Sequence, residues 1–356
     1  MLQALFHAWE RRLANATKDR VVRPFDWGLD WIPANGHRPG AAPADVIEDW
    51  VSHVMRDTDK FFTPPPTADY TFTPQPDGDL LTFPSALATP HDSNNIAYAR
   101  FFPGRVRDNL KAVPDRSPGV PRPRAAVLVL PQWNADANGH VGLCRLLAWN
   151  GMAALRLSLP YHDQRMPPEL HRADYIVSAN LARTLQVCRQ AVLDARRAIA
   201  WLAMQGYDRI GILGTSLGSC LALLTTAHEP LVQAEALNHI SPYFADVVWR
   251  GISTRHVRDG MDGHIELDLL RALWRPISPR MYLDRVRDRR TLLVYARYDL
   301  SFPVDLSEDL VAAFRDARIP HDVVVLRCGH YSTGMAPFKY VDGWVLTRFL
   351  KKALGA

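Results

Sequence analysis

Short apolar runs alternate with amphipathic stretches from residue 125 onward. The runs are short and continuous, which is the pattern of strands buried on both faces. The stretches between them repeat apolar positions at helical spacing. This alternation predicts an α/β fold with a mostly parallel central sheet and helices on both faces. Strands are expected at 125–131, 152–160, 210–213, 234–242, 290–299 and 321–328, and helices at about 140–150, 173–205, 305–318 and 338–354, with one more directly after residue 218.

The first part of the chain has a different pattern. Residues 2–16 carry apolar side chains on one face and predict an amphipathic helix that packs on its own domain. Asp45 is expected to cap a second helix over 46–57. Residues 68–104 predict the antiparallel strands that begin the sheet. We therefore expect residues 1–79 to form a helical and irregular N-terminal extension.

Two segments interrupt the alternation. Residues 105–124 are polar and proline-rich, which predicts a surface loop. Residues 243–286 lie between two predicted strands, are helical and arginine-rich in pattern, and carry no strand signal. We expect this second segment to form a helical cap that covers a pocket and sets its specificity. Its arginines could favour an anionic substrate, but we expect them to be solvated surface charge.

A serine between two glycines stands at one strand-to-helix junction. The apolar run 210–213 is followed by G-T-S-L-G at 214–218 and then by a helix-forming segment. A turn this sharp strains its central residue, and side chains two residues to either side would clash. Gly214 and Gly218 remove that clash and push Ser216 clear of the sheet at a helix N-terminus. The setting is that of a nucleophile elbow, although the five residues taken alone also fit a plain loop.

Three chemically capable side chains each follow a predicted buried strand, namely Ser216, Asp299 and His330. The carboxyl ends of parallel strands meet at one edge of a sheet, where α/β folds bind ligands. We therefore expect the three to converge there. Asp305 and Asp322 are alternative acids, but Asp305 occupies a helix N-cap position and Asp322 opens a strand.

Other polar residues near this edge have structural explanations. His162 and Asp163 follow a strand and would either line the pocket or hold a loop. His239 ends a strand beside Ser241, a setting typical of a hydrogen-bonded structural histidine. No H-x-H, H-E-x-x-H or Cys/His cluster indicates a metal, and no G-x-G-x-x-G or Walker sequence indicates a nucleotide. We expect neither a metal nor a cofactor.

With serine, aspartate and histidine in this chain order, residues 80–354 resemble the α/β-hydrolase superfamily, and within it the dienelactone-hydrolase and acetyl-esterase-like branches. The motifs that carry the resemblance are G-T-S-L-G, the acid in A-R-Y-D-L-S-F-P and the histidine in C-G-H-Y. The resemblance implies the α/β-hydrolase fold. It also implies that Ser216 is the nucleophile, His330 its base, and Asp299 the residue that orients the imidazole.

The resemblance further implies an oxyanion hole built from two backbone N–H groups. One belongs to Leu217, the residue after the nucleophile. The other lies in a loop after an earlier strand, which here begins Pro131-Gln132-Trp133, where many members have His-Gly-x. By position we expect the N–H of Trp133, with that of Gln132 as the alternative.

Composition narrows the class of protein further. The 356 residues carry a formal charge of +5, with 47% hydrophobic and 22% charged residues, which is ordinary for a soluble globular protein. No basic stripe with interleaved aromatic residues indicates nucleic-acid binding. No apolar run reaches about 18 residues, and the N-terminus lacks the pattern of a signal peptide, so we expect no membrane insertion. Four cysteines without a C-x-x-C pair predict reduced, buried thiols and a cytoplasmic location.

We therefore predict a serine hydrolase that cleaves a small-molecule carboxylic ester through an acyl-enzyme. The same triad would serve a thioesterase, an amidase or a peptidase. A hydrolase fold that binds without catalysis is a second class, but such proteins usually lack a triad member and this chain has all three. No pattern in the sequence selects the natural substrate or the oligomeric state.

Overall fold

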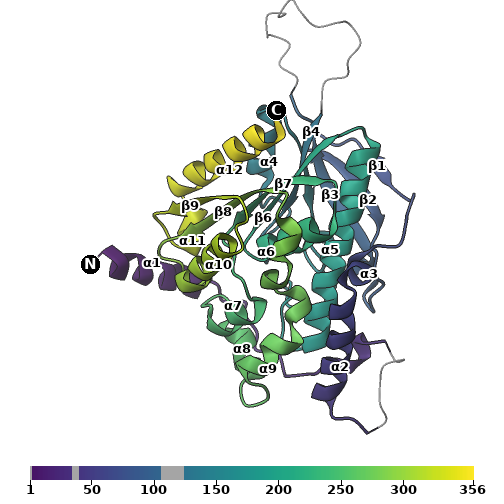
Figure 1. Ribbon diagram of the computed structural model, residues 1–356, viewed down its shortest axis with the longest axis vertical. Helices are drawn as coiled ribbons and strands as arrows, with labels where there is room; N and C mark the ends of the chain where they lie inside the picture. Colours follow the sequence, from purple (N-terminus) through teal and green to yellow (C-terminus); the bar gives the residue numbers. More distant parts are fainter. Residues whose placement is uncertain (1, 34–39, 106–123) are drawn as a thin grey trace, which may run out of the picture.

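A nine-stranded sheet runs through the part of the chain that the computed structural model describes, residues 2–33, 40–105 and 124–356 (Figure 1). Its strands are β1 Thr71–Thr73, β2 Asp79–Pro84, β3 Ile96–Phe102, β4 Ala125–Leu130, β5 Ala153–Leu157, β6 Arg209–Thr215, β7 Val232–Asn238, β8 Arg290–Ala296 and β9 His321–Leu326. They lie in the order β1-β2-β3-β5-β4-β6-β7-β8-β9. The pairs from β1 to β5 are antiparallel, and those from β5 to β9 are parallel. The expected loop 105–124 falls almost entirely outside the described residues.

Helices cover both faces of this sheet (Figure 1). Alternate side chains of β4 show why. Ala126 and Leu128 pack in one cluster with helices of one face, α5 (Leu181–Met204), α6 (Leu217–His228) and α10 (Val304–Asp316). Val127 and Val129 pack in another with helices of the opposite face, α4 (Val141–Trp149) and α12 (Phe338–Leu354). Successive strand residues point to opposite faces, so an uninterrupted apolar strand has to be covered on both sides. The prediction of a mostly parallel sheet between two helical layers is confirmed. The helices are α1 Leu2–Ala16, α2 Pro43–Arg56, α3 Thr58–Phe62, α4 Val141–Trp149, α5 Leu181–Met204, α6 Leu217–His228, α7 Phe244–Arg250, α8 Arg255–Met261, α9 Leu267–Leu273, α10 Val304–Asp316, α11 His330–Thr333 and α12 Phe338–Leu354.

Two predicted helix starts were wrong. Helix α2 begins at Pro43, with Ala42 as its N-cap, and Asp45 does not cap it. Proline fits the first position of a helix because its φ is preset and its missing N–H is not needed there. Helix α5 begins at Leu181 rather than at 173, because the Asn180 side chain accepts a hydrogen bond from a backbone N–H of the first turn, at 3.0 Å.

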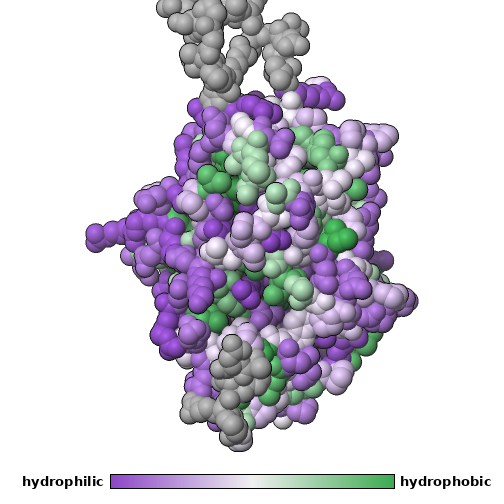
Figure 2. Space-filling model, turned by 90° about the vertical axis from the view of Figure 1, so that its right-hand side faces the viewer, coloured by the Kyte–Doolittle hydropathy of each residue, from purple (hydrophilic) through white to green (hydrophobic). Residues whose placement is uncertain are grey.

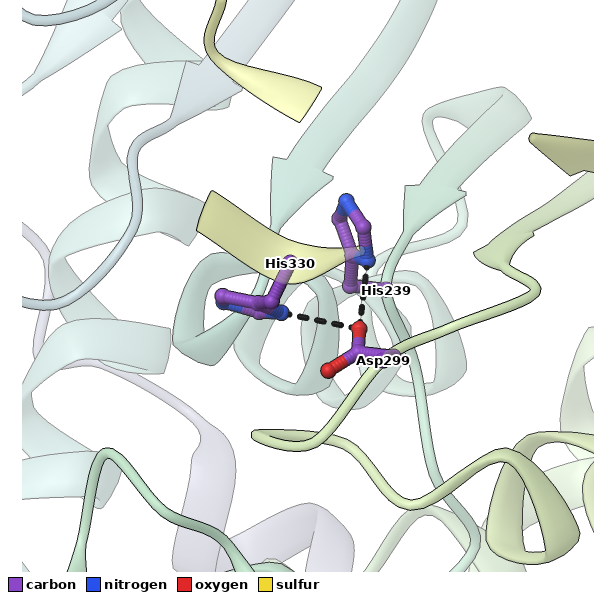
Figure 3. A group of neighbouring side chains, drawn as sticks. All are labelled: His239, Asp299 and His330. Atoms are coloured by element: carbon purple, nitrogen blue, oxygen red, sulfur yellow. Dashed lines mark hydrogen bonds and ion pairs between the residues drawn. The ribbon is translucent and has the colours of Figure 1, made fainter. Parts of the chain in front are cut away.

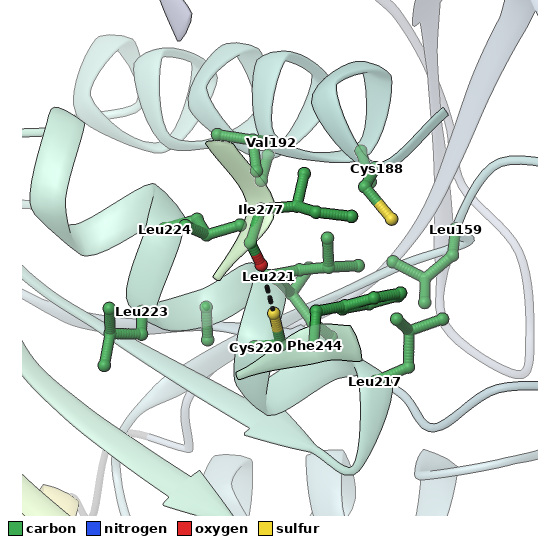
Figure 4. Packing of buried hydrophobic residues seen from close by; sticks show 14 of the residues in the cluster. Leu159, Cys188, Val192, Leu217, Cys220, Leu221, Leu223, Leu224, Phe244 and Ile277 are labelled. Carbon is green, nitrogen blue, oxygen red and sulfur yellow. Dashed lines mark hydrogen bonds between the residues drawn. The ribbon is translucent and has the colours of Figure 1, made fainter. Parts of the chain in front are cut away.

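The segment 243–286 is helical, as predicted, and lies between β7 and β8. It contains α7, α8 and α9 and two short 3₁₀ helices, η5 Arg275–Ile277 and η6 Pro279–Val286. Phe244 and Ile277 of this segment pack with Leu217 and Leu221 of α6 (Figure 4). The helix that follows the predicted nucleophile is therefore anchored by the segment expected to cap the site.

All four cysteines are buried and unpaired, as the sequence predicts. In the described ranges, no helix combines the length and the apolar character needed to cross a membrane. Figure 2 shows the face seen from the right of Figure 1, where hydrophobic side chains form scattered patches among hydrophilic ones.

Candidate active site

Ser216 stands on a strained turn between β6 and α6. Its backbone angles are φ 57° and ψ −120°, a region that residues with a side chain rarely occupy. A Cβ atom on Gly214 would lie 2.1 Å from the carbonyl oxygen of Gly218. A Cβ atom on Gly218 would lie 2.2 Å from the carbonyl oxygen of Leu130, at the end of β4. Only glycine fits at either position, which agrees with the predicted strand–elbow–helix arrangement.

Asp299 follows β8, and His330 begins α11 after β9. Because the carboxylate can only accept, the Nδ1–H of His330 donates to Asp299 Oδ2, at 2.9 Å. The other oxygen, Oδ1, accepts the backbone N–H groups of Ser301 at 2.8 Å and Phe302 at 2.7 Å. These bonds fix the carboxylate, which holds the imidazole with Nε2 turned away from it (Figure 3). Ser216 and His330 line the same cavities, although no hydrogen bond joins them within the described residues.

A second histidine binds the same carboxylate oxygen. His239 follows β7, and its Nδ1 lies 2.9 Å from Asp299 Oδ2 (Figure 3). Its ring centroid is 4.6 Å from that of His330, and its side chain is buried. The sequence interpretation treated His239 as a structural histidine and missed this contact. The available signal was its position, since it follows a buried strand just as Ser216 and Asp299 do.

The electrostatics of this cluster separate the two histidines. Burial lowers the pKa of His239, and the neighbouring His330 lowers it further. Burial also disfavours protonation of His330, but the charge and hydrogen bond of Asp299 raise the pKa of His330 above its usual value. Burial alone would raise the pKa of Asp299, yet the two imidazoles hold it well below its usual range. Asp299 therefore stays ionised, His239 stays neutral, and His330 is the ring that takes up a proton first.

The N-terminal helix supports the turn that carries His330. Glu10 of α1 is fully buried, and its carboxylate accepts the backbone N–H groups of Tyr331 at 2.8 Å and Ser332 at 3.0 Å. It also accepts the Ser332 hydroxyl at 2.7 Å. Phe6, one turn earlier, stacks on Tyr298 with ring centroids 4.5 Å apart, beside the predicted acid. Nothing in the pattern of residues 2–16 indicated this role, because it depends on a distant partner.

The alternative acids lie elsewhere. Asp305 pairs with Arg250 on the surface, at 2.7 Å, and Asp322 lies within β9.

His162 and Asp163 hold loops. The Nε2 of His162 accepts the backbone N–H of the residue after Trp133, at 2.9 Å, and Asp163 forms a buried ion pair with an arginine of β5. Of the two explanations offered for this pair, the structure favours loop support.

The loop after β4 brings Trp133 to the site. Its indole N–H donates to the Ala173 carbonyl oxygen at 2.9 Å, and its ring stacks on His256, with centroids 5.7 Å apart. In the described part of the chain, the backbone N–H groups of Gln132, Trp133 and Leu217 have no hydrogen-bond acceptor. Both predicted oxyanion-hole positions therefore carry free donors near Ser216.

Two cavities meet at Ser216 and His330. The smaller, of about 60 Å³, is mostly apolar and is lined by Leu217 and by residues of the 243–286 segment such as Phe244 and Val248. The larger, of about 1040 Å³, extends between α4 and α12. Trp133 and Ser253 line both, so a substrate bound at Ser216 has a small apolar pocket on one side and a wider, more polar cavity on the other.

His239, Asp299 and His330 also form a set of metal-ligand type, since one atom of each lies within 4.8 Å of the others. Two imidazoles and a carboxylate suit several transition metals. In this arrangement, however, both Nδ1 atoms lie at hydrogen-bond distance from the same carboxylate oxygen. These hydrogen bonds satisfy the three groups, and the geometry fits an acid–imidazole pair better than a metal centre.

No protein-family model matches the sequence, and no curated protein matches it either. Solved structures do resemble it. An acetyl xylan esterase from Paenibacillus sp. R4 gives a TM-score of 0.59 at 14% identity, over 92% of this chain and 98% of that one. Acetyl xylan esterase 1 from Thermoanaerobacterium sp. JW/SL YS485 gives 0.55 at 14% identity, over 91% and 99%. The acylaminoacyl peptidase of Pyrococcus horikoshii gives 0.56 at 13% identity over 80% of this chain, which spans only 42% of that peptidase. The chain therefore has the α/β-hydrolase fold, as the resemblance implied.

Proposed function

We propose that this chain is a serine hydrolase that cleaves a carboxylic ester through an acyl-enzyme. The observation that carries the proposal is the hydrogen bond between His330 Nδ1 and a fixed Asp299, in a cavity that the elbow residue Ser216 also lines. A serine is a weak nucleophile at its ordinary pKa and needs a base beside it. The esterase and peptidase titles of the similar structures agree with this chemistry.

In the proposed mechanism Ser216 Oγ attacks the ester carbon while His330 Nε2 accepts its proton. Asp299 holds the imidazole in the tautomer with the proton on Nδ1 and stabilises the imidazolium that forms. The imidazolium then protonates the leaving alcohol, and the acyl group remains on Ser216. Water deprotonated by His330 attacks the acyl carbon, which releases the acid and restores the serine.

The oxyanion that develops in both steps is proposed to bind the backbone N–H groups of Leu217 and Trp133. Both donors lack an acceptor in the described residues, and both residues line the smaller cavity with Ser216. Gln132 is the alternative second donor, but it lines only the larger cavity. Removal of one such donor costs roughly 3–4 kcal/mol of transition-state stabilisation in related chemistry, so the loop after β4 matters for the rate.

The small apolar cavity favours a short acyl group, because its side chains leave about 60 Å³ beside Ser216. The segment 243–286, which supplies part of that wall, is proposed to act as the cap that sets acyl specificity. A small-molecule ester is the proposed substrate, with a thioester or an amide as alternatives. Four unpaired thiols suit a reducing compartment, and we propose a cytoplasmic location.

Hydrolysis of p-nitrophenyl esters of increasing acyl length tests the proposal. We expect the highest kcat/KM at short chains, and loss of activity in the Ser216→Ala and His330→Ala variants. Ser241→Ala is the matched control, because this serine also lines the smaller cavity but has no proposed chemical role. Undiminished hydrolysis by Ser216→Ala would overturn the proposal.

A further inference from the structure

The larger cavity is lined by more positive than negative side chains. The only carboxylate among its described lining residues is Asp342, and burial raises the pKa of that group to about 7, so it is only partly ionised near neutrality. A cleft lined mainly by one sign of charge concentrates ligands of the opposite sign. The cations of the lining are Arg20, Arg172, Lys339, Arg348 and Lys351.

Arg20 differs from Arg172, the buried arginine of this wall. Arg172 is neutralised, since it pairs with Asp19 at 2.9 Å and with Asp174 at 3.6 Å. In contrast, no carboxylate of the described chain lies within 4.0 Å of the Arg20 guanidinium. Its Nε is buried and has no hydrogen-bond partner. A half-buried guanidinium without a counter-ion is an unusual arrangement, because burial of an unpaired charge is costly.

The position of Arg20 is fixed relative to the candidate active site. Its Nη2 donates to the Tyr331 hydroxyl at 2.8 Å, and Tyr331 directly follows His330. The same hydroxyl is 2.8 Å from the hydroxyl of Ser253, which lines both cavities together with Ser216. The guanidinium is therefore anchored at the junction of the two cavities. Anchoring lowers the entropy lost when a planar donor binds a carboxylate or phosphate.

The neighbouring His256 does not neutralise Arg20. Burial, with smaller contributions from the charges of Arg172 and Arg20, lowers the pKa of this histidine to about 4. Neither ring nitrogen of His256 has a hydrogen-bond partner. His256 therefore supplies no counter-charge to Arg20, and Asp19 is paired with Arg172.

We propose that Arg20 binds an anionic group, a carboxylate or a phosphate, on the ester that Ser216 attacks. The inference rests on the proposed function and names its substrate class: esters whose acyl part or alcohol part is negatively charged. Arg20 takes no part in bond breaking here; it selects and orients the substrate. Two arginines of the segment 243–286 differ from Arg20 in this respect, since Arg250 and Arg271 pair with aspartates.

Two matched pairs of esters test the proposal. On the acyl side, p-nitrophenyl butyrate is compared with mono-p-nitrophenyl succinate, which adds a carboxylate. On the alcohol side, phenyl acetate is compared with 4-acetoxybenzoate. We expect wild-type kcat/KM to be higher for the anionic member of at least one pair. In Arg20→Gln that anionic-to-neutral ratio should fall by about tenfold or more, the factor that corresponds to about 1.4 kcal/mol of lost interaction.

Arg287→Gln is the matched control, because it removes the same charge from an exposed arginine paired with Asp284. Its ratios should equal those of the wild type. If Arg20→Gln does not fold, Tyr331→Phe removes the hydroxyl that anchors Nη2, and the same ratio should fall severalfold. If the wild type hydrolyses none of the four esters, the proposed function fails. If it hydrolyses them and the Arg20→Gln ratios match the wild type, only the anion-binding role of Arg20 is overturned.

Discussion

The carboxylate of Glu10 accepts the backbone N–H of Tyr331 at 2.8 Å, although 321 positions separate the two residues in the chain. Tyr331 directly follows the proposed catalytic base. An N-terminal helix that the sequence places in an extension thus supplies a buried negative charge to the turn that carries His330.

Replacement of Glu10 by glutamine is expected to shift the pH profile of ester hydrolysis. Burial lowers the pKa of His330, whereas the charge and hydrogen bond of Asp299 raise it and the Glu10 charge makes a smaller contribution in the same direction. His330 acts as a base only when neutral, so activity rises with pH through the pKa of His330. Loss of the Glu10 charge lowers this pKa and moves the acidic limb of kcat/KM to lower pH. Turnover should also fall by about tenfold, because the turn loses charged hydrogen bonds worth about 1.5–3 kcal/mol each. Glu48→Gln, on an exposed face of α2, is the control. A pH profile of Glu10→Gln equal to that of the wild type would contradict the proposed effect of Glu10 on His330.

His239→Leu is expected to lower kcat by about tenfold with little change in KM. The variant removes one of the two imidazole donors to Asp299 Oδ2, which leaves His330 on Oδ2 and two backbone N–H groups on Oδ1. The carboxylate then orients the base less firmly. His330→Ala should be far more damaging. Steady-state kinetics of the two variants checks that His330, and not His239, is the base. This assignment fails if His239→Leu is inactive while His330→Ala retains activity.

Gly218→Ala is expected to destabilise the fold and abolish activity. The new Cβ would approach the Leu130 carbonyl oxygen to 2.2 Å, so α6 or the end of β4 has to shift. Overpacking of this kind costs about 1–3 kcal/mol, measured as the free energy of unfolding in denaturant. Gly142→Ala in α4 is the control, since nothing lies within 4 Å of its Cβ position. Equal stability of the two variants would argue against a tight elbow.

Glu235 is expected to make the folded state less stable as pH rises. Burial raises the pKa of this side chain from 4.5 to about 7, despite a hydrogen bond from the Thr291 hydroxyl. Between these values the folded state binds more protons than the unfolded state, so its free energy of unfolding falls with increasing pH. The difference corresponds to up to about 3 kcal/mol. In Glu235→Gln the part of this pH dependence that Glu235 causes should disappear. Chemical denaturation of both proteins at pH 4.5 and pH 8 measures their free energies of unfolding. An equal change with pH in the wild type and the variant would contradict the prediction.

The sheet and the positions of three candidate residues could be predicted because each depends on local pattern. Ser216, Asp299 and His330 follow continuous apolar runs, and such runs in an alternating chain give parallel strands whose ends meet. The glycine spacing of the elbow is a local steric requirement, and the structure shows the clash it avoids.

The contacts of Glu10 and His239 could not be predicted in the same way. Glu10 lies in a short amphipathic helix, where a polar residue is expected to face solvent, and only the docked position of α1 explains its burial. His239 required knowledge that the ends of β7 and β8 are neighbours and that its ring turns toward Asp299. The start of α2 was missed because Asp45 and Pro43 are both plausible start signals, and the proline is the earlier of the two.

Labelling with a fluorophosphonate probe tests the central claim most directly. The probe reacts with serines that a neighbouring base activates, and mass spectrometry of the digested protein locates the modified residue. We predict one modified site, Ser216, with labelling that is lost in Ser216→Ala, strongly reduced in His330→Ala and retained in Ser241→Ala. Absence of labelling at Ser216 in the wild type, or labelling undiminished in His330→Ala, would contradict the account.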